Sequence, residues 1–166
     1  MHNELTKEDI KKMEEELEYR MGVLRPEILE EVKFARSHGD LSENFEYKAA
    51  KQYKNQNESR IRYLERMLKN AEVIEDEWKS DEVGLNSLVK IYIEEDDEEE
   101  EYKIVTSIRG SSLKGYISIE SPLGKALLGH KVGDRVYIKV NDTYGYEAVI
   151  RSISKEDESG DEIRKF

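Results

Sequence analysis

Two apolar stripes with helical spacing constrain this chain more than any other feature. Apolar residues recur every three or four positions from Ile10 to Ala35, and again from Tyr47 to Ala71, where Asn57 interrupts them. This spacing places each set on one face of an α-helix, and a polar residue in such a seam is typical of register setting. Because only a few residues join stripes of similar length, we expect an antiparallel hairpin within one chain rather than an intermolecular coiled coil.

The stretch 37–44 between the stripes is expected to form a tight turn. Gly39 is the residue type that ends a helix in a left-handed conformation, and Asp40 or Ser42 is the type that caps the next helix. Asp40 and Glu43 also have the spacing of a capping box, so spacing alone favours a structural role for both. At ~1.5 Å per residue, about thirty helical residues would place this turn roughly 45 Å from the hairpin base.

The start and the middle of the first helix carry their own signals. Thr6 followed by Asp9 predicts an N-cap with an acidic first turn. Pro26 has no amide hydrogen and clashes with the preceding helical turn, so we expect a kink or short break between Gly22 and Pro26.

Alternating patterns replace the helical period after Val73. A short helix is expected after Ser121, with Pro122 at its first position and Gly129 past its end. The acidic run 94–101 is expected to be a solvated hairpin loop. The expected strands are 87–93, 102–106, 116–119, 135–140 and 146–153. The predicted fold class is therefore α+β: a coiled-coil hairpin over 1–76, a small antiparallel β-sheet domain with one short helix over 77–154, and a charged, disordered tail over 155–166.

Charge and composition exclude several classes of protein. The 38 acidic and 27 basic residues give a net charge of −11, which argues against general binding to duplex nucleic acid. Segment 75–101 holds thirteen acids and two lysines, whereas segment 36–69 holds eight bases and five acids. No cysteine is present, so disulfides and thiolate metal sites are excluded. With no signal peptide and no membrane-length apolar stretch, we expect a cytoplasmic protein without membrane contact.

Two ordered motifs carry a resemblance to a known family. The residues 25–28 with 35–50, and then 119–134, closely resemble the GreA/GreB family of bacterial transcription elongation factors, which stimulate transcript cleavage. The resemblance covers roughly Leu5 to Ile153. It implies an FKBP-like C-terminal domain, and the small number of bases near the turn suggests the GreA side of the family.

The resemblance implies a partner and a cofactor. Such a factor inserts its coiled coil into the secondary channel of RNA polymerase, while its C-terminal domain docks at the channel rim. There Asp40 and Glu43 match the acids that help to hold a Mg²⁺ ion shared with the polymerase, which hydrolyses the 3′ end of backtracked RNA. The factor is not an enzyme alone, and the isolated protein is expected to be a monomer without bound Mg²⁺.

The family also carries a basic patch that contacts the 3′ segment of the nascent RNA. Arg36 and Lys51 match it, and Lys48 and Lys54 are candidates to extend it, although solvated helix faces explain each of them equally well. The residues expected to support the turn are Gly39, Ser42, Asn44 and Tyr47.

Other functions stay open from the sequence. The chain could be a related protein that enters the same channel and inhibits cleavage. The intact pair of Asp40 and Glu43 argues against this function. An FKBP-type prolyl isomerase with a coiled-coil arm is another, suggested only by the expected fold of the second domain. A coiled-coil scaffold is the least specific.

Overall fold

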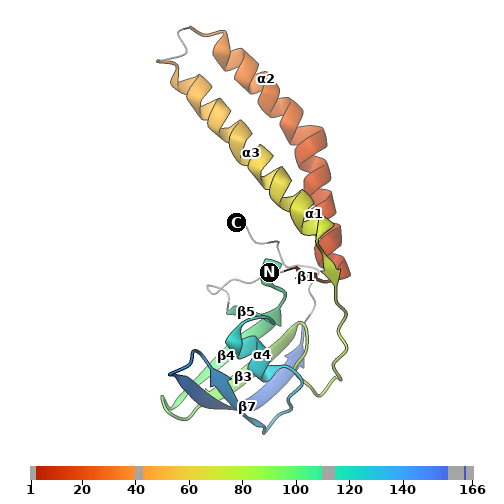
Figure 1. Ribbon diagram of the computed structural model, residues 1–166, viewed down its shortest axis with the longest axis vertical. Coiled ribbons are helices and arrows are strands. Elements are labelled where there is room, and N and C mark those ends of the chain that lie inside the picture. Colours follow the sequence, from red (N-terminus) through yellow and green to blue (C-terminus); the bar gives the residue numbers. More distant parts are fainter. Residues whose placement is uncertain (1–2, 40–42, 110–114, 157–162, 164–166) are drawn as a thin grey trace. The chain divides into compact units, whose positions relative to one another are not determined.

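The computed structural model describes residues 3–39, 43–109, 115–156 and 163. They form two compact units (Figure 1), one of Ile10–Ala71 and the other of Met1–Asp9 with Glu72–Phe166. We call these the helical unit and the sheet unit. The first nine residues thus group with the C-terminal part of the chain, whereas the predicted hairpin domain, 1–76, included them.

The helical unit is the expected antiparallel hairpin. Its first arm consists of α1 (Lys7–Tyr19), which begins in the sheet unit, the π-helix η1 (Arg20–Leu24) and α2 (Arg25–Arg36), and its second arm is α3 (Phe45–Lys69). In Figure 1 α2 and α3 run side by side. The apolar side chains buried along the arms are Met13, Ile28, Ala35, Ala50, Ile61 and Leu64.

The predicted break in the first arm is the π-helix. The amide of Arg25 donates to the carbonyl of Arg20, five residues back, and Pro26 sits in the first turn of α2. Pro26 has no N–H for a regular helical bond to Gly22, so a wider turn accommodates it. The wider turn also shifts the helical phase. Met21, which the stripe predicted as a seam residue, is therefore 40% exposed.

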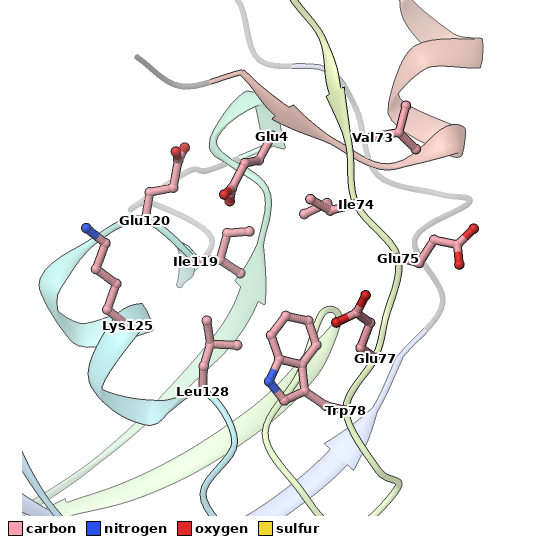
Figure 2. A pocket seen from close by; sticks show the side chains of 10 residues that line it. All are labelled: Glu4, Val73, Ile74, Glu75, Glu77, Trp78, Ile119, Glu120, Lys125 and Leu128. Carbon is pink, nitrogen blue, oxygen red and sulfur yellow. The ribbon is translucent and has the colours of Figure 1, made fainter.

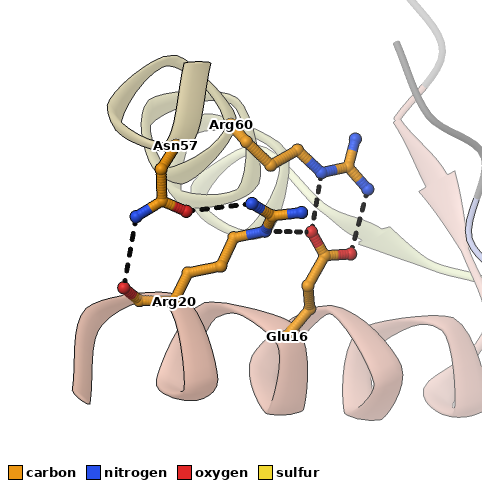
Figure 3. A network of polar contacts seen from close by, with 4 residues as sticks. All are labelled: Glu16, Arg20, Asn57 and Arg60. Atoms are coloured by element: carbon orange, nitrogen blue, oxygen red, sulfur yellow. Dashed lines mark hydrogen bonds and ion pairs between the residues drawn. The ribbon is translucent and has the colours of Figure 1, made fainter. Parts of the chain in front are cut away.

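A polar network joins the two arms beside the π-helix (Figure 3). The Glu16 carboxylate accepts hydrogen bonds from Arg20 Nε at 2.7 Å and from Arg60 Nε and Nη2 at 2.7 and 3.0 Å. Arg20 Nη1 donates to Asn57 Oδ1 at 2.9 Å, and Asn57 Nδ2 donates to the Arg20 carbonyl at 3.4 Å. Asn57 thus aligns α3 with the π-helix, which is the register-setting role its seam position suggested.

We expect Glu16→Gln to lower the free energy of unfolding by ~1–3 kcal/mol at pH 7, because buried Arg60 loses a charged acceptor. Burial alone would raise the pKa of Glu16, but the hydrogen bonds from Arg60 and Arg20 bring it below its ordinary value of 4.5. A lowered folded-state pKa stabilises the fold above the unfolded pKa, and this contribution is lost as the pH falls through the folded value. Urea titrations at pH 7 and pH 3 should therefore show the variant and wild type converging in acid. A gap that stays constant would contradict this role.

The sheet unit contains a five-stranded sheet in the order β5-β4-β3-β7-β6. β3 (Ser87–Ile93) pairs antiparallel with β4 (Glu98–Val105) and with β7 (Gly145–Lys155), and β7 pairs antiparallel with β6 (Arg135–Lys139). The sheet is mixed rather than purely antiparallel, since β5 (Tyr116–Ser118) runs parallel to β4. The core lies among inward-facing residues, including Val89, Ile91, Ile104, Ile138 and Ile150.

The helix expected after Ser121 is present as α4 (Pro122–Leu127). The Ser121 hydroxyl accepts the Gly124 amide at 3.0 Å, with Pro122 in the first turn and Gly129 at φ +80° beyond the end. The predicted cap, helix and stop are confirmed.

Three predictions about the sheet unit need correction. The acidic run is not one loop, because Glu98 to Glu101 belong to β4 and pair with β3, leaving only a four-residue turn. Solvent on one face of a strand tolerates such acids. Lys155 ends β7 opposite Ser87 instead of starting a tail, while 157–162 and 164–166 lie outside the described residues. A parallel pair, β1 (Glu4–Leu5) with β2 (Glu72–Val73), was not predicted.

Asp9 links the start of α1 to the rest of the sheet unit. The Asp9 carboxylate accepts a hydrogen bond from the Thr6 amide at 3.0 Å, and the Asp9 amide donates one to Thr6 Oγ1 at 3.1 Å. These two bonds confirm the predicted cap. The same carboxylate is fully buried and lies 2.8 Å from Arg109 Nε. It also accepts a hydrogen bond from the Thr106 hydroxyl at 2.6 Å. One acid therefore serves a helix start and a buried ion pair.

Candidate functional site

The candidate site is the turned end of the hairpin. At the end of α2 the amide of Ser37 donates to the carbonyls of Lys33 and Phe34 at 3.3 and 3.2 Å, and the amide of His38 donates to Ala35 at 3.2 Å. Gly39 follows at φ +128°, a conformation that side chains rarely adopt. The predicted glycine stop is therefore where the sequence placed it.

Asn44, not Asp40 or Ser42, caps the second arm. Its Oδ1 accepts the Tyr47 amide at 3.0 Å, and its Nδ2 donates to the Ala35 carbonyl at 2.6 Å. Asn44 directly precedes Phe45, the first residue of α3, so the capping-box interpretation of Asp40 and Glu43 was wrong for this helix. Asp40 and Ser42 themselves lie outside the described residues. One amide thus starts α3 and ties it to the end of α2.

Two substitutions should separate these functions of Asn44. Asn44→Ala loses both bonds and should cost ~1 kcal/mol or more of stability. Asn44→Ser keeps an oxygen acceptor for the helix start but loses the donor to Ala35, so it should cost less. Thermal denaturation of both variants tests this, and equal losses would contradict the separation.

Three of the four predicted basic residues gather around Tyr47. Arg36 Nη2 donates to the Tyr47 hydroxyl at 3.2 Å, and its guanidinium lies 5.4 Å from the ring centre. This hydrogen bond lowers the pKa of Tyr47, and the charges of Arg36, Lys51 and Lys54 lower it further. We call Arg36, Tyr47, Lys51 and Lys54 the basic flank. Lys48 does not join it, because its ammonium lies 5.6 Å from the ring centre of Phe45.

Glu43 is the acid of the turn that the structure describes. Glu43 is exposed just before α3. Within the described part of the chain, no group of three or more His, Asp or Glu side chains could hold a metal ion. Carboxylate oxygen is what Mg²⁺ prefers, and this ion usually takes only one or two protein carboxylates. Glu43 thus offers the type of oxygen donor that Mg²⁺ takes in proteins.

The sheet unit has a separate cavity of about 620 Å³, shown in Figure 2. Apolar side chains, among them Trp78 and Leu128, lie beside several acids in its lining. Burial raises the pKa of Glu4, and the neighbouring charges of Glu120 and Glu72 add to that shift. Sequence reasoning missed this cavity, since β1 and β2 are too short to leave a periodic signal. Its lining residues are Glu4, Val73, Ile74, Glu75, Glu77, Trp78, Ile119, Glu120, Lys125 and Leu128.

No helix among the described residues has the length and apolar character needed to cross a bilayer.

Comparisons with known proteins match both units. Residues 3–73 match the family "Transcription elongation factor, N-terminal", and residues 78–155 match "Transcription elongation factor, GreA/GreB, C-term". The chain is 53% identical to transcription elongation factor GreA of Thermoanaerobacter pseudethanolicus over 82% of this chain and 87% of that protein. It is 50% identical to GreA of Clostridium kluyveri over 83% and 87%.

A solved structure is also similar. GreA factor homolog 1 of Thermus thermophilus is 28% identical, with a TM-score of 0.43 over 92% of this chain and 99% of that one. The names of the curated relatives favour neither a channel inhibitor nor a prolyl isomerase. Both units match the family models, and the chain is 53% identical to a GreA protein over most of its length. The chain therefore belongs to the GreA/GreB family of transcription elongation factors.

Proposed function

We propose that this protein inserts its helical hairpin into the secondary channel of RNA polymerase and stimulates hydrolysis of the 3′ end of backtracked RNA by the polymerase. It acts as an accessory factor and is not a nuclease alone. The observation that carries this proposal is the end of the hairpin. There Asn44, which follows Glu43 directly, bonds to both arms beside the basic flank.

The turn would serve the polymerase active site through its acids. We assign Asp40 and Glu43 the role of completing the coordination of a Mg²⁺ ion shared with the polymerase, whose chemistry is to activate water and neutralise charge on the phosphate. Two carboxylates on one short turn are too few to hold the ion by themselves, so they act only when the hairpin is in place. Their task is to position oxygen donors.

The basic flank would hold the RNA. Arg36 presents a planar guanidinium that is already oriented by Tyr47, and Lys51 and Lys54 lie one and two helical turns along the same side of α3. Guanidinium and ammonium groups bind phosphate oxygens, and the planar group does so with two parallel hydrogen bonds. This flank would thus keep the RNA 3′ segment beside the turn.

A cleavage assay on a backtracked elongation complex tests the proposal. RNA labelled at its 3′ end is incubated in a stalled complex with Mg²⁺, with and without the protein, and the protein is also incubated with the same RNA alone. We expect short 3′ fragments only when polymerase and protein are both present. Fragments from RNA alone would indicate a nuclease, and no stimulation would overturn the proposal.

A further inference from the structure

The end of the hairpin has a second flank whose chemistry is opposite to that of the first. On α3 the residues of the basic flank lie to one side of buried Ala50, whereas Glu46, Ala49 and Tyr53 lie to the other side. There they meet Glu31 and Phe34 of α2 around a groove of about 410 Å³, whose lining also includes Ala35 and Ala50. We call this feature the apolar–acidic groove.

The groove is shaped to receive a side chain. Three alanines, Ala35, Ala49 and Ala50, leave it hollow, and two aromatic rings stand beside them. Phe34 is 65% exposed and Tyr53 is 41% exposed. Exposed aromatic rings contribute little to the packing of the hairpin itself. Large exposed aromatic side chains around a hollow are typical of protein interaction sites.

The charges of the groove decide the class of its occupant. Glu31 and Glu46 bring two carboxylates to its lining, and Arg36 and the lysines of the basic flank lie on the other side of the seam. Carboxylates repel phosphate, which excludes a nucleic-acid backbone, and they attract Lys or Arg. The occupant must therefore be apolar enough to fill the groove and cationic enough to meet its rim.

We propose that the apolar–acidic groove docks a segment of the polymerase channel wall that presents an apolar side chain next to a lysine or arginine. This inference rests on the proposed function, because it takes the polymerase as the partner. The two sides of the hairpin then fix its rotation about its long axis, because the basic flank faces RNA while the groove faces protein. Asp40 and Glu43 thereby reach the polymerase active site in one orientation.

Ala49→Arg tests the groove without removing any contact of the fold. Arginine is a good helix former, so α3 should remain intact, but its side chain fills the groove and places a positive charge beside Glu31 and Glu46, which repels a cationic partner. Gln52→Arg is the matched control, since it adds the same charge at an exposed α3 position outside the groove lining. We expect Ala49→Arg to weaken binding to core RNA polymerase by tenfold or more, and Gln52→Arg to change it by less than twofold. Equal affinities of both variants and wild type would overturn the inference.

The outcomes separate the inference from the proposed function. If the wild type itself fails to bind polymerase, the proposed function falls; if the wild type binds and Ala49→Arg binds equally well, only the groove inference falls. The photoreactive residue p-benzoylphenylalanine in place of Phe34 identifies the occupant. We expect a crosslink to a polymerase peptide that contains Lys or Arg, whereas a crosslink to RNA or to a second copy of this chain would overturn the assignment.

Discussion

Asp40→Asn should abolish stimulated RNA cleavage and leave the stability of the protein unchanged. Because Asn44 supplies the cap of α3, the start of that helix does not depend on Asp40. The substitution replaces a charged oxygen donor for Mg²⁺ by a weaker neutral one. We expect cleavage to fall by at least about 100-fold, the scale of losing one group that stabilises developing charge. The measurement is the rate of 3′ fragment release from a backtracked complex.

The control for Asp40→Asn is competition. The variant keeps the basic flank, so it should still occupy the polymerase and inhibit cleavage stimulated by the wild type at comparable concentrations. Its thermal midpoint should match that of the wild type. Cleavage at the wild-type rate would remove Asp40 from the reaction, and a lowered midpoint would return it to a structural role.

Asp9→Asn should be the most destabilising single change at the start of α1. Asp9 is fully buried and 2.8 Å from Arg109, which is 3% exposed. Removing one partner of a buried ion pair leaves the other charge uncompensated, and this typically costs ~3–5 kcal/mol. Urea denaturation of the full chain measures the loss.

Glu8→Gln is the matched control for Asp9→Asn, because it removes the same charge from the same helical turn. Glu8 has no place in the buried ion pair, so we expect a change of less than about 0.5 kcal/mol. A variant with leucine at both Asp9 and Arg109 should recover part of the stability, since it leaves no buried charge. If Asp9→Asn and Glu8→Gln cost the same, the buried pair does not contribute as proposed.

Much of the fold could be predicted because its signals are local. The helical stripes, the glycine stop at Gly39, the Thr6 cap and the proline-associated break each depend on residues within one or two turns. The prediction of the strands failed where the composition of a strand hid its pattern. Glu98 to Glu101 read as a loop because a run of acids shows no alternation, yet pairing with β3 supplies backbone bonds that composition does not reveal.

The site was predicted less completely, and the reason is again physical. Asp40 and Asn44 are both good cap residues, and only the three-dimensional path of the turn decides between them. The basic candidates were named as one group, but the 100° rotation per residue sends Lys48 away from Tyr47 and toward Phe45. The apolar–acidic groove was missed, since it depends on the register of α2 against α3, which brings Phe34 and Tyr53 to the same groove and which the predicted hairpin did not specify.

The short parallel pair of β1 and β2 also has a consequence for protein engineering. Glu4 pairs with Glu72 and Leu5 with Val73, so the chain enters and leaves the hairpin at two neighbouring points joined by backbone hydrogen bonds. Backbone bonds do not depend on side-chain identity. A hairpin from another member of the family could therefore be grafted between these two points as a cassette that retains Thr6 and Asp9, because Asp9 forms the buried pair with Arg109.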